Sequence, residues 1–167
     1  MTVTINGTTG IAGVDGSAAT PAVQGADTNT GMFFPAADTI AFTEGGTEVM
    51  RLDSSANLQF NSGYGSVATA YGCRAWVNFD GTTNTAGFCT IRASGNVTSV
   101  ADNGTGDYTV NFTTAMPDAN YTPVFSSTNF TDNNGSQTTS TCRFRCFSKA
   151  STTTNQDSAT ACAAFFR

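Results

Sequence analysis

The sequence predicts an all-β fold, and three observations support this prediction. Residues 106–114 alternate with Tyr108, Val110 and Phe112 on one face and polar residues on the other, which is typical of a half-buried antiparallel strand. Pairs of asparagine or aspartate with glycine, which tolerate positive φ, separate several similar segments. No stretch has a convincing helical period, and charged residues make up only 11% of the chain. A surface of hydroxyls and amides suits an extracellular particle or fibre.

Two regions are expected along the chain. Residues 1–37 are rich in glycine, alanine and threonine with little periodicity, so we expect an extended anchoring arm that becomes ordered only against a partner. This arm and a following β-hairpin region fill residues 1–70, ending in a linker-like stretch. Residues 71–167 are expected to form an antiparallel β-sandwich head, jelly-roll-like in topology.

The hairpin is expected around a loop at residues 45–47. A three-residue loop would place Ile40 and Phe42 opposite Leu52 and Met50, so that all four apolar side chains share one face. A two-residue turn would instead place Phe42 opposite Val49 and Ile40 opposite Arg51, which scatters the apolar side chains over both faces. The sequence therefore favours the longer loop.

The same register opposes Glu44 and Glu48. This repulsion of roughly 0.2–1 kcal/mol is smaller than the roughly 1.5–3 kcal/mol for each large apolar side chain that is buried. One hairpin is marginal in water, and a short third strand at 57–60 is expected to cover part of its face. The region remains too thin to bury its apolar groups, which predicts a homo-oligomer. The candidate interface residues are Phe33, Phe34, Ile40, Phe42, Met50, Leu52, Leu58 and Phe60.

The second region is expected to be built of short strands and turns. Strands are predicted near 74–79, 88–93, 96–101, 106–114, 121–128, 142–147 and 160–166. Turns are predicted at Asp80-Gly81, Asn103-Gly104 and Asn134-Gly135, and polar loops over 129–140 and 151–158. In the strand at 142–147, alternation points Cys142, Phe144 and Cys146 inward.

The five cysteines cannot all pair within one chain. Cys142 and Cys146 lie four residues apart in a predicted strand, which separates them by about 13 Å. A disulfide needs roughly 4.4–6.8 Å between Cα atoms. We therefore expect buried thiols in a protein that folds in a reducing cytoplasm. A zinc site is disfavoured because there is no CxxC pair and no histidine.

Charge and hydropathy exclude several classes of function. The net charge is −5 and the seven Lys and Arg residues are scattered, whereas nucleic acids and anionic lipids require a basic patch. The first 20 residues lack the basic and apolar segments of an export signal, so neither Sec export nor membrane insertion is expected. No nucleic-acid partner and no cofactor are expected.

Catalysis is not expected either. Without histidine, Ser-His-Asp and Cys-His arrangements are excluded. A polysaccharide hydrolase is a remote alternative, because Glu44 with Glu48, or Asp102 with Asp107, offers a pair of carboxylates. Both pairs bracket glycine-rich turns, where solvated acids are ordinary. The segment 102–107 lacks the residue order of a calcium loop, so a tight turn is favoured there.

A candidate surface for binding is polar and aromatic. Arg74, Trp76, Asn78 and Arg92 are candidates to line one face of the kind that holds sugars, but the favoured interpretation of Trp76 is a core or subunit-interface residue, because large aromatic side chains are mostly buried. The loop residues Asp132, Asn133 and Asn134 are further surface-binding candidates.

Two stretches resemble known proteins. Residues 27–58 read DTNTGMFFPAADTIAFTEGGTEVMRLDSSANL and resemble a segment common in tailed-bacteriophage fibre proteins. The segments AWVNFDGT, IRASGNVTSV and DNGTGDYTVNFTTAMPDANYTPV within 74–125 are similar to the distal β-domain of phage tail fibres, particularly cyanophage fibres. The two stretches cover about half of the chain.

The resemblance implies a homotrimer, with residues 1–70 as its anchoring and trimerising region, assembled in the host cytoplasm and exposed on the virion. It brings no catalytic residues. The long shaft and the tail-attachment domain of a typical fibre are not expected, nor is a self-cleaving chaperone domain. The implied protein is a short trimeric tail fibre or spike that adheres to the host surface, possible glycans included. The alternative is a trimeric capsid decoration protein, a cement protein or head fibre, whose N-terminal arm grips other virion proteins.

Overall fold

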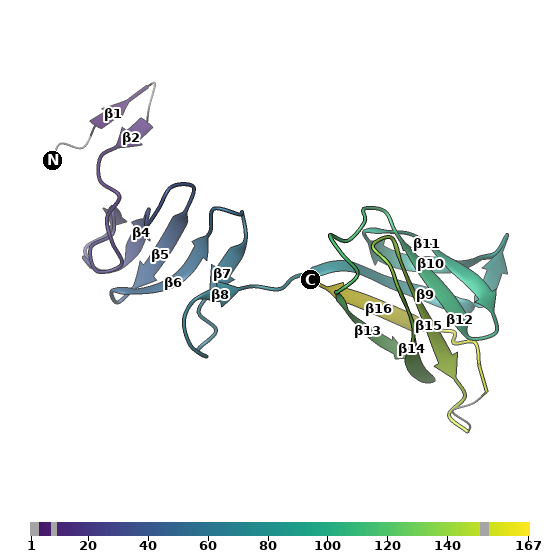
Figure 1. Ribbon diagram of the computed structural model, residues 1–167. Helices are drawn as coiled ribbons and strands as arrows, with labels where there is room; N and C mark the ends of the chain where they lie inside the picture. The colour runs from purple at the N-terminus through teal and green to yellow at the C-terminus, as the bar shows by residue number, and fades with distance from the viewer. Residues whose placement is uncertain (1–3, 8–9, 151–153) are drawn as a thin grey trace. The chain divides into compact units, whose positions relative to one another are not determined.

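The protein is all-β, with every strand pairing antiparallel. The computed structural model describes residues 4–7, 10–150 and 154–167, and no helix occurs among them. The chain divides into two compact units, Met1–Ala70 and Tyr71–Arg167 (Figure 1). Each unit is described by itself below.

The first unit contains a small hairpin and a six-stranded sheet in simple sequence order. The hairpin pairs β1 (Thr4–Asn6) with β2 (Gly10–Ala12), and the sheet consists of β3 (Val23–Gln24), β4 (Gly31–Phe33), β5 (Ile40–Glu44), β6 (Thr47–Leu52), β7 (Leu58–Phe60) and β8 (Ala68–Thr69). The prediction of an extended arm through residue 37 is wrong for β3 and β4, because β4 pairs along β5 and extends the sheet. The predicted strand at 57–60 lies beside β6 as β7, not over the apolar face.

The predicted register of the β5–β6 hairpin is confirmed, but its loop is not. Ile40 pairs with Leu52 and Phe42 with Met50, and the register then shifts so that Val49 is an extra residue in β6. The turn is therefore the two residues Gly45 and Gly46, both at positive φ (56° and 76°), which matches the twist of the strands. Through this bulge the apolar side chains share one face without opposing Glu44 to Glu48.

The other face of the sheet is covered by the chain's own N-terminal segment. The Phe34 N–H donates to the carbonyl of Asp15 (2.8 Å), and the Thr43 hydroxyl donates to the carbonyl of Ala18 (2.8 Å). Phe33 and Ala41 are buried on this side, at 4% and 0% exposure. The sheet thus has one covered face and one face that this unit leaves open.

The second unit is one eight-stranded sheet in the order β13-β16-β9-β10-β11-β12-β15-β14. Its strands are β9 (Cys73–Thr85), β10 (Phe88–Gly95), β11 (Val97–Gly104), β12 (Asp107–Phe112), β13 (Thr122–Ser127), β14 (Phe130–Gln137), β15 (Thr141–Phe147) and β16 (Ala161–Phe166). The two end strands, β13 and β14, also contact each other, so the sheet closes around a core (Figure 1). This arrangement is consistent with a β-sandwich.

Aromatic rings fill the core of this unit. Phe79, Tyr108 and Phe144 are fully buried and pack edge-to-face or tilted, with centroids 5.1 to 6.1 Å apart. Cys142, Phe144 and Cys146 point inward as predicted, each at 0% exposure. All five cysteines are free, but the prediction of buried thiols holds only for Cys89, Cys142 and Cys146, since Cys162 is half-buried and Cys73 is exposed.

All three predicted turns lie within strands in the structure. Asn103-Gly104 ends β11, and the turn to β12 is formed by the next two residues, Thr105 and Gly106. β9 runs straight through Asp80-Gly81, because Gly81 is needed for packing: its carbonyl accepts the Tyr108 hydroxyl (3.0 Å), and a Cβ there would collide with that ring. The predicted loop over 129–140 is wrong as well, since it forms β14. The Asn134-Gly135 pair marks a register shift within that strand.

Candidate functional site

The open face of the N-terminal sheet carries two rows of apolar side chains. Residues that pair across an antiparallel sheet project from the same face. One row therefore joins Val23, Met32, Phe42, Met50 and Phe60, and the other joins Ile40, Leu52 and Leu58. Ile40, Leu52, Leu58 and Phe60 remain 39–45% exposed. We call these eight residues the apolar face.

Six of the predicted interface residues lie on the apolar face, and two do not. Phe33 projects from the covered side of the sheet and is buried. Phe34 follows β4 and lines a hollow at the end of the sheet. Sequence reasoning missed Val23 and Met32, because β3 and β4 are too short to show an alternation.

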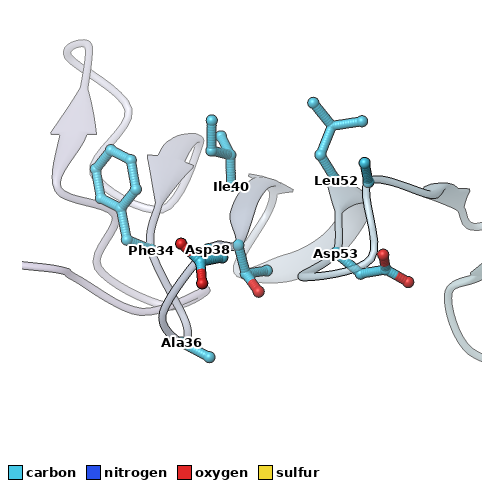
Figure 2. A pocket seen from close by; sticks show the side chains of 8 residues that line it. Phe34, Ala36, Asp38, Ile40, Leu52 and Asp53 are labelled. Carbon is cyan, nitrogen blue, oxygen red and sulfur yellow. The ribbon is translucent and has the colours of Figure 1, made fainter.

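The hollow beside Phe34 has a volume of about 530 Å³ and mixes apolar and acidic residues. In Figure 2, Ile40 and Leu52 project from the same side of the sheet, and Asp38 and Asp53 lie below them. The Asp53 carboxylate accepts hydrogen bonds from the N–H groups of Asn57 and Ser55 (both 2.9 Å), which lower its pKa. It therefore fixes the turn after β6 and is not poised for proton transfer.

The eight residues of the apolar face are uncharged, although Glu44 projects from the same side at the end of β5; the covered face carries Arg51 and Glu48. Arg51 forms an ion pair with Glu48 on the covered side, and this hydrogen-bonded contact raises the pKa of Arg51. Glu48 and Glu44 therefore project from opposite faces of the sheet. A surface of this composition gains free energy when it is covered by another apolar surface.

On the second unit, Trp76 lies on the outer face of the sheet and is 43% exposed. It is thus not a core residue. Asn78 is two residues away along β9 and projects from the same face, whereas Arg74 is the extra residue of a bulge opposite Phe165 and Phe166 and is exposed beside Trp76 in the chain. The structure brings these three predicted residues together.

Arg92 of β10 lies in the same region, but its guanidinium already forms hydrogen bonds within the chain. Its guanidinium donates to the Asp80 carboxylate (2.9 Å), to the Phe79 carbonyl (2.7 Å) and to the Asn78 side-chain oxygen (3.3 Å). Hydrogen bonds from Thr82 and the charge of Arg92 lower the pKa of Asp80. Arg92 therefore positions Asn78 instead of offering a free cation.

The predicted loop candidates do not join this region. Asp132, Asn133 and Asn134 lie in the edge strand β14, which four strands separate from β9 in the sheet order. Asp132 pairs in register with Arg145, and the Asn133 amide donates to Gln137 (2.8 Å). These residues belong to a different surface.

The second carboxylate pair also lacks the arrangement of a catalytic site. The Arg143 guanidinium donates two hydrogen bonds to the Asp107 carboxylate (2.7 and 2.6 Å). Burial alone would raise the pKa of Asp107, but the hydrogen bonds and charge of Arg143 outweigh it and leave the pKa below its ordinary value. Asp102 accepts from Asn84 (2.7 Å). Among the described residues, no three His, Cys, Asp or Glu gather where they could hold a metal ion.

Comparisons with known proteins assign the chain to no family. No protein-family model matches the sequence, and no match was found among curated proteins or solved structures. In the described part of the chain, no helix is long and apolar enough to cross a membrane. Function is therefore inferred from the two surfaces above.

Proposed function

We propose that this chain is a non-enzymatic structural protein of a phage virion. It is a short homotrimeric protein of the tail-fibre or spike type, in which the N-terminal unit assembles the trimer and the β-sandwich is displayed for adhesion to a host surface. The observation that carries this proposal is the uncovered apolar face of the N-terminal sheet.

The apolar face is costly to leave in water. Full burial of a large apolar side chain contributes roughly 1.5–3 kcal/mol, so covering the exposed part of each member contributes on the order of 1 kcal/mol. Its eight members are uncharged, with Glu44 projecting from the same side only at the end of β5, which suits contact with the same face of other copies around a common axis. That the oligomer contains three copies is inferred from the resemblance of residues 27–58 and 74–125 to phage fibres.

A structural role agrees with the acids and thiols of the chain. Glu48 and Asp107 are each tied to an arginine, and the chain contains no histidine. Burial raises the pKa of the Cys89 thiol to about 12 and that of Cys142 to about 11, so these thiols stay protonated and unreactive. Free, buried thiols suit assembly in a reducing host cytoplasm before the virion is released.

Two measurements test the proposal. Light scattering on the purified chain should give about three times the chain mass of 17.2 kDa, and a stable single-chain mass would refute the trimer. Labelled antibody on whole virions should then mark the tail. Labelling spread over the capsid would instead assign the chain to the alternative role of a trimeric capsid decoration protein.

A further inference from the structure

Trp76 is the only tryptophan of the chain, and the sheet is shaped around it. Its indole occupies the space above Gly95 of β10, where a Cβ would lie 2.5 Å from Nε1 and 3.0 Å from Cδ1. Gly95 therefore lets the ring rest against the backbone of the neighbouring strand. Although it is held in this way, the residue stays 43% exposed.

The neighbours of Trp76 leave it uncovered. Its cross-strand partner on β16 is Ala164, and the next residue in that row is Val124 of β13, which is 53% exposed. Both are smaller than the indole. The result is a low apolar strip beside the indole on the outer face of the second unit, and Phe166, two residues after Ala164 in β16, is a second exposed ring on this face (38%).

Hydrogen-bond donors lie on both sides of the ring along β9. The Arg74 guanidinium is exposed and forms no hydrogen bond or ion pair with the described residues. Asn78 accepts from Arg92 through its oxygen, which leaves its amide nitrogen directed away from that contact and without a partner in the described part of the chain. A free cation and a free amide donor therefore flank the indole.

We propose that Arg74, Trp76 and Asn78 form a binding platform for an acidic sugar residue of a surface glycan. A pyranose ring has an apolar face of C–H groups and a rim of hydroxyls, so it packs on the exposed indole while Asn78 donates to a hydroxyl. The planar guanidinium of Arg74 binds the sugar carboxylate through two hydrogen bonds. This inference rests on the proposed role of the sandwich as a displayed adhesive head.

The size and charge of the strip favour a glycan over a macromolecular partner. An aromatic side chain buries roughly 150–250 Å², and a stable protein interface needs about 800 Å² from each partner. Trp76 and Val124 fall well short of that area. One unpaired arginine is also too little for nucleic acid, which requires several phosphate contacts. Because the platform stands on paired strands, little ordering opposes binding.

The single tryptophan makes the test direct. The full chain is applied to an array of purified bacterial surface polysaccharides, half of them carrying uronic or sialic acids and half neutral. Fragments of the best-bound polysaccharide are then titrated while the fluorescence of Trp76 is followed. We expect acidic glycans to bind and to change the emission of Trp76.

Four variants locate the contact. Trp76→Ala should abolish binding, and so should Gly95→Val, because the added side chain displaces the indole. Arg74→Gln should lower the affinity for acidic glycans by roughly 10-fold to 100-fold. Phe88→Ala removes an aromatic of similar exposure (46%) elsewhere on β10 and should bind like the natural chain. Absence of binding to every glycan overturns the proposal, as does binding that Trp76→Ala leaves intact. Equal binding of neutral glycans with no effect of Arg74→Gln refutes the acidic specificity.

Light scattering on the same variants separates this site from the assembly. The platform lies on the second unit, so Trp76→Ala should keep the mass of the natural chain. If that mass falls when Trp76 is removed, the strip is a subunit contact and the glycan platform is wrong. If the natural chain is a monomer that still binds acidic glycans through Trp76, the platform stands and the trimer fails.

Discussion

The two sheets of this protein place their apolar side chains in opposite ways. The eight-stranded sheet closes on itself and buries Phe79, Phe144 and Phe165 completely. The six-stranded sheet stays open, and Leu52 and Phe60 on its apolar face are 45% and 44% exposed. The sandwich has its core within the chain, and in the trimer that we propose the N-terminal sheet completes its core with the same sheet of other copies.

The same comparison separates two kinds of stability. A closed core stabilises the sandwich at any protein concentration. A sheet that is completed by other copies depends on concentration, because association and folding are linked. Variants in the two units should therefore differ in how their effects depend on protein concentration.

The largest effect is expected from a charge on the apolar face. Leu52→Asp places a carboxylate where apolar faces meet, so the mass from light scattering should fall from three chains to one. Phe88→Asp is the matched control, because Phe88 is 46% exposed but lies on the sandwich. It should keep the threefold mass, and dissociation by both variants equally would contradict the role of the apolar face.

The next effect is the loss of a core ring from the sandwich. Phe144→Ala should lower the free energy of unfolding of this unit by about 3–5 kcal/mol, at every protein concentration. Phe60→Ala on the apolar face should act differently, with a loss that grows as assembly becomes complete and nearly vanishes on dilution. Chemical denaturation at two concentrations measures both. If both variants lost the same free energy of unfolding at both concentrations, the two units would not differ in how they are stabilised.

A smaller effect is expected at Gly81. A methyl group there meets the Tyr108 ring and disturbs its hydrogen bond to the Gly81 carbonyl, so Gly81→Ala should cost about 1–3 kcal/mol. Gly72→Ala is a suitable control, because a Cβ at Gly72 meets nothing within 4 Å. Thermal unfolding of the two variants should differ clearly, and equal melting temperatures would show that Gly81 is not a packing residue.

The smallest effect concerns pH. The pKa of Asp107 is lowered in the folded chain, so its ion pair with Arg143 stabilises the sandwich above the ordinary carboxyl pKa and is lost as pH falls through the folded value. Asp107→Asn should therefore be less stable than the natural chain at pH 7, with the difference closing in acid. Asp118→Asn, at an exposed pair with Arg167, should change little. A difference that persists unchanged at low pH would rule out the ionic cause.

Much of the fold followed from the sequence where the alternation was long. Strands with a clear period of two, such as 106–114, were predicted, and so was the pairing of Ile40 with Leu52. The turn of that hairpin was missed because a bulge at Val49 lets a two-residue turn and a one-sided apolar face coexist. Gly81 was taken for a turn residue because sequence does not show that Tyr108 needs the space beside it.

The candidate surfaces were harder to predict. Six members of the apolar face could be found because they alternate within β5, β6 and β7, whereas Met32 lies in a strand of three residues. The spacing of Trp76 and Asn78 placed them on one face of β9, whereas the bulge at Arg74 could not be read from the sequence. Asn134 was assigned to a loop because the residues of β14 are mostly polar and show no apolar alternation. The apolar residues of this pair of strands lie in its partner, β15.

The most direct test of the central claim asks whether the apolar face is covered. Met32 and Met50 lie on that face, and Met116 is buried in the sandwich at 4% exposure. Hydroxyl-radical footprinting converts accessible methionine to its sulfoxide, which mass spectrometry reads residue by residue. In the natural chain Met32 and Met50 should be protected as well as Met116, and in Leu52→Asp they alone should become reactive. Rapid oxidation of Met32 and Met50 in the natural chain would show that the face stays open, and would contradict assembly through it.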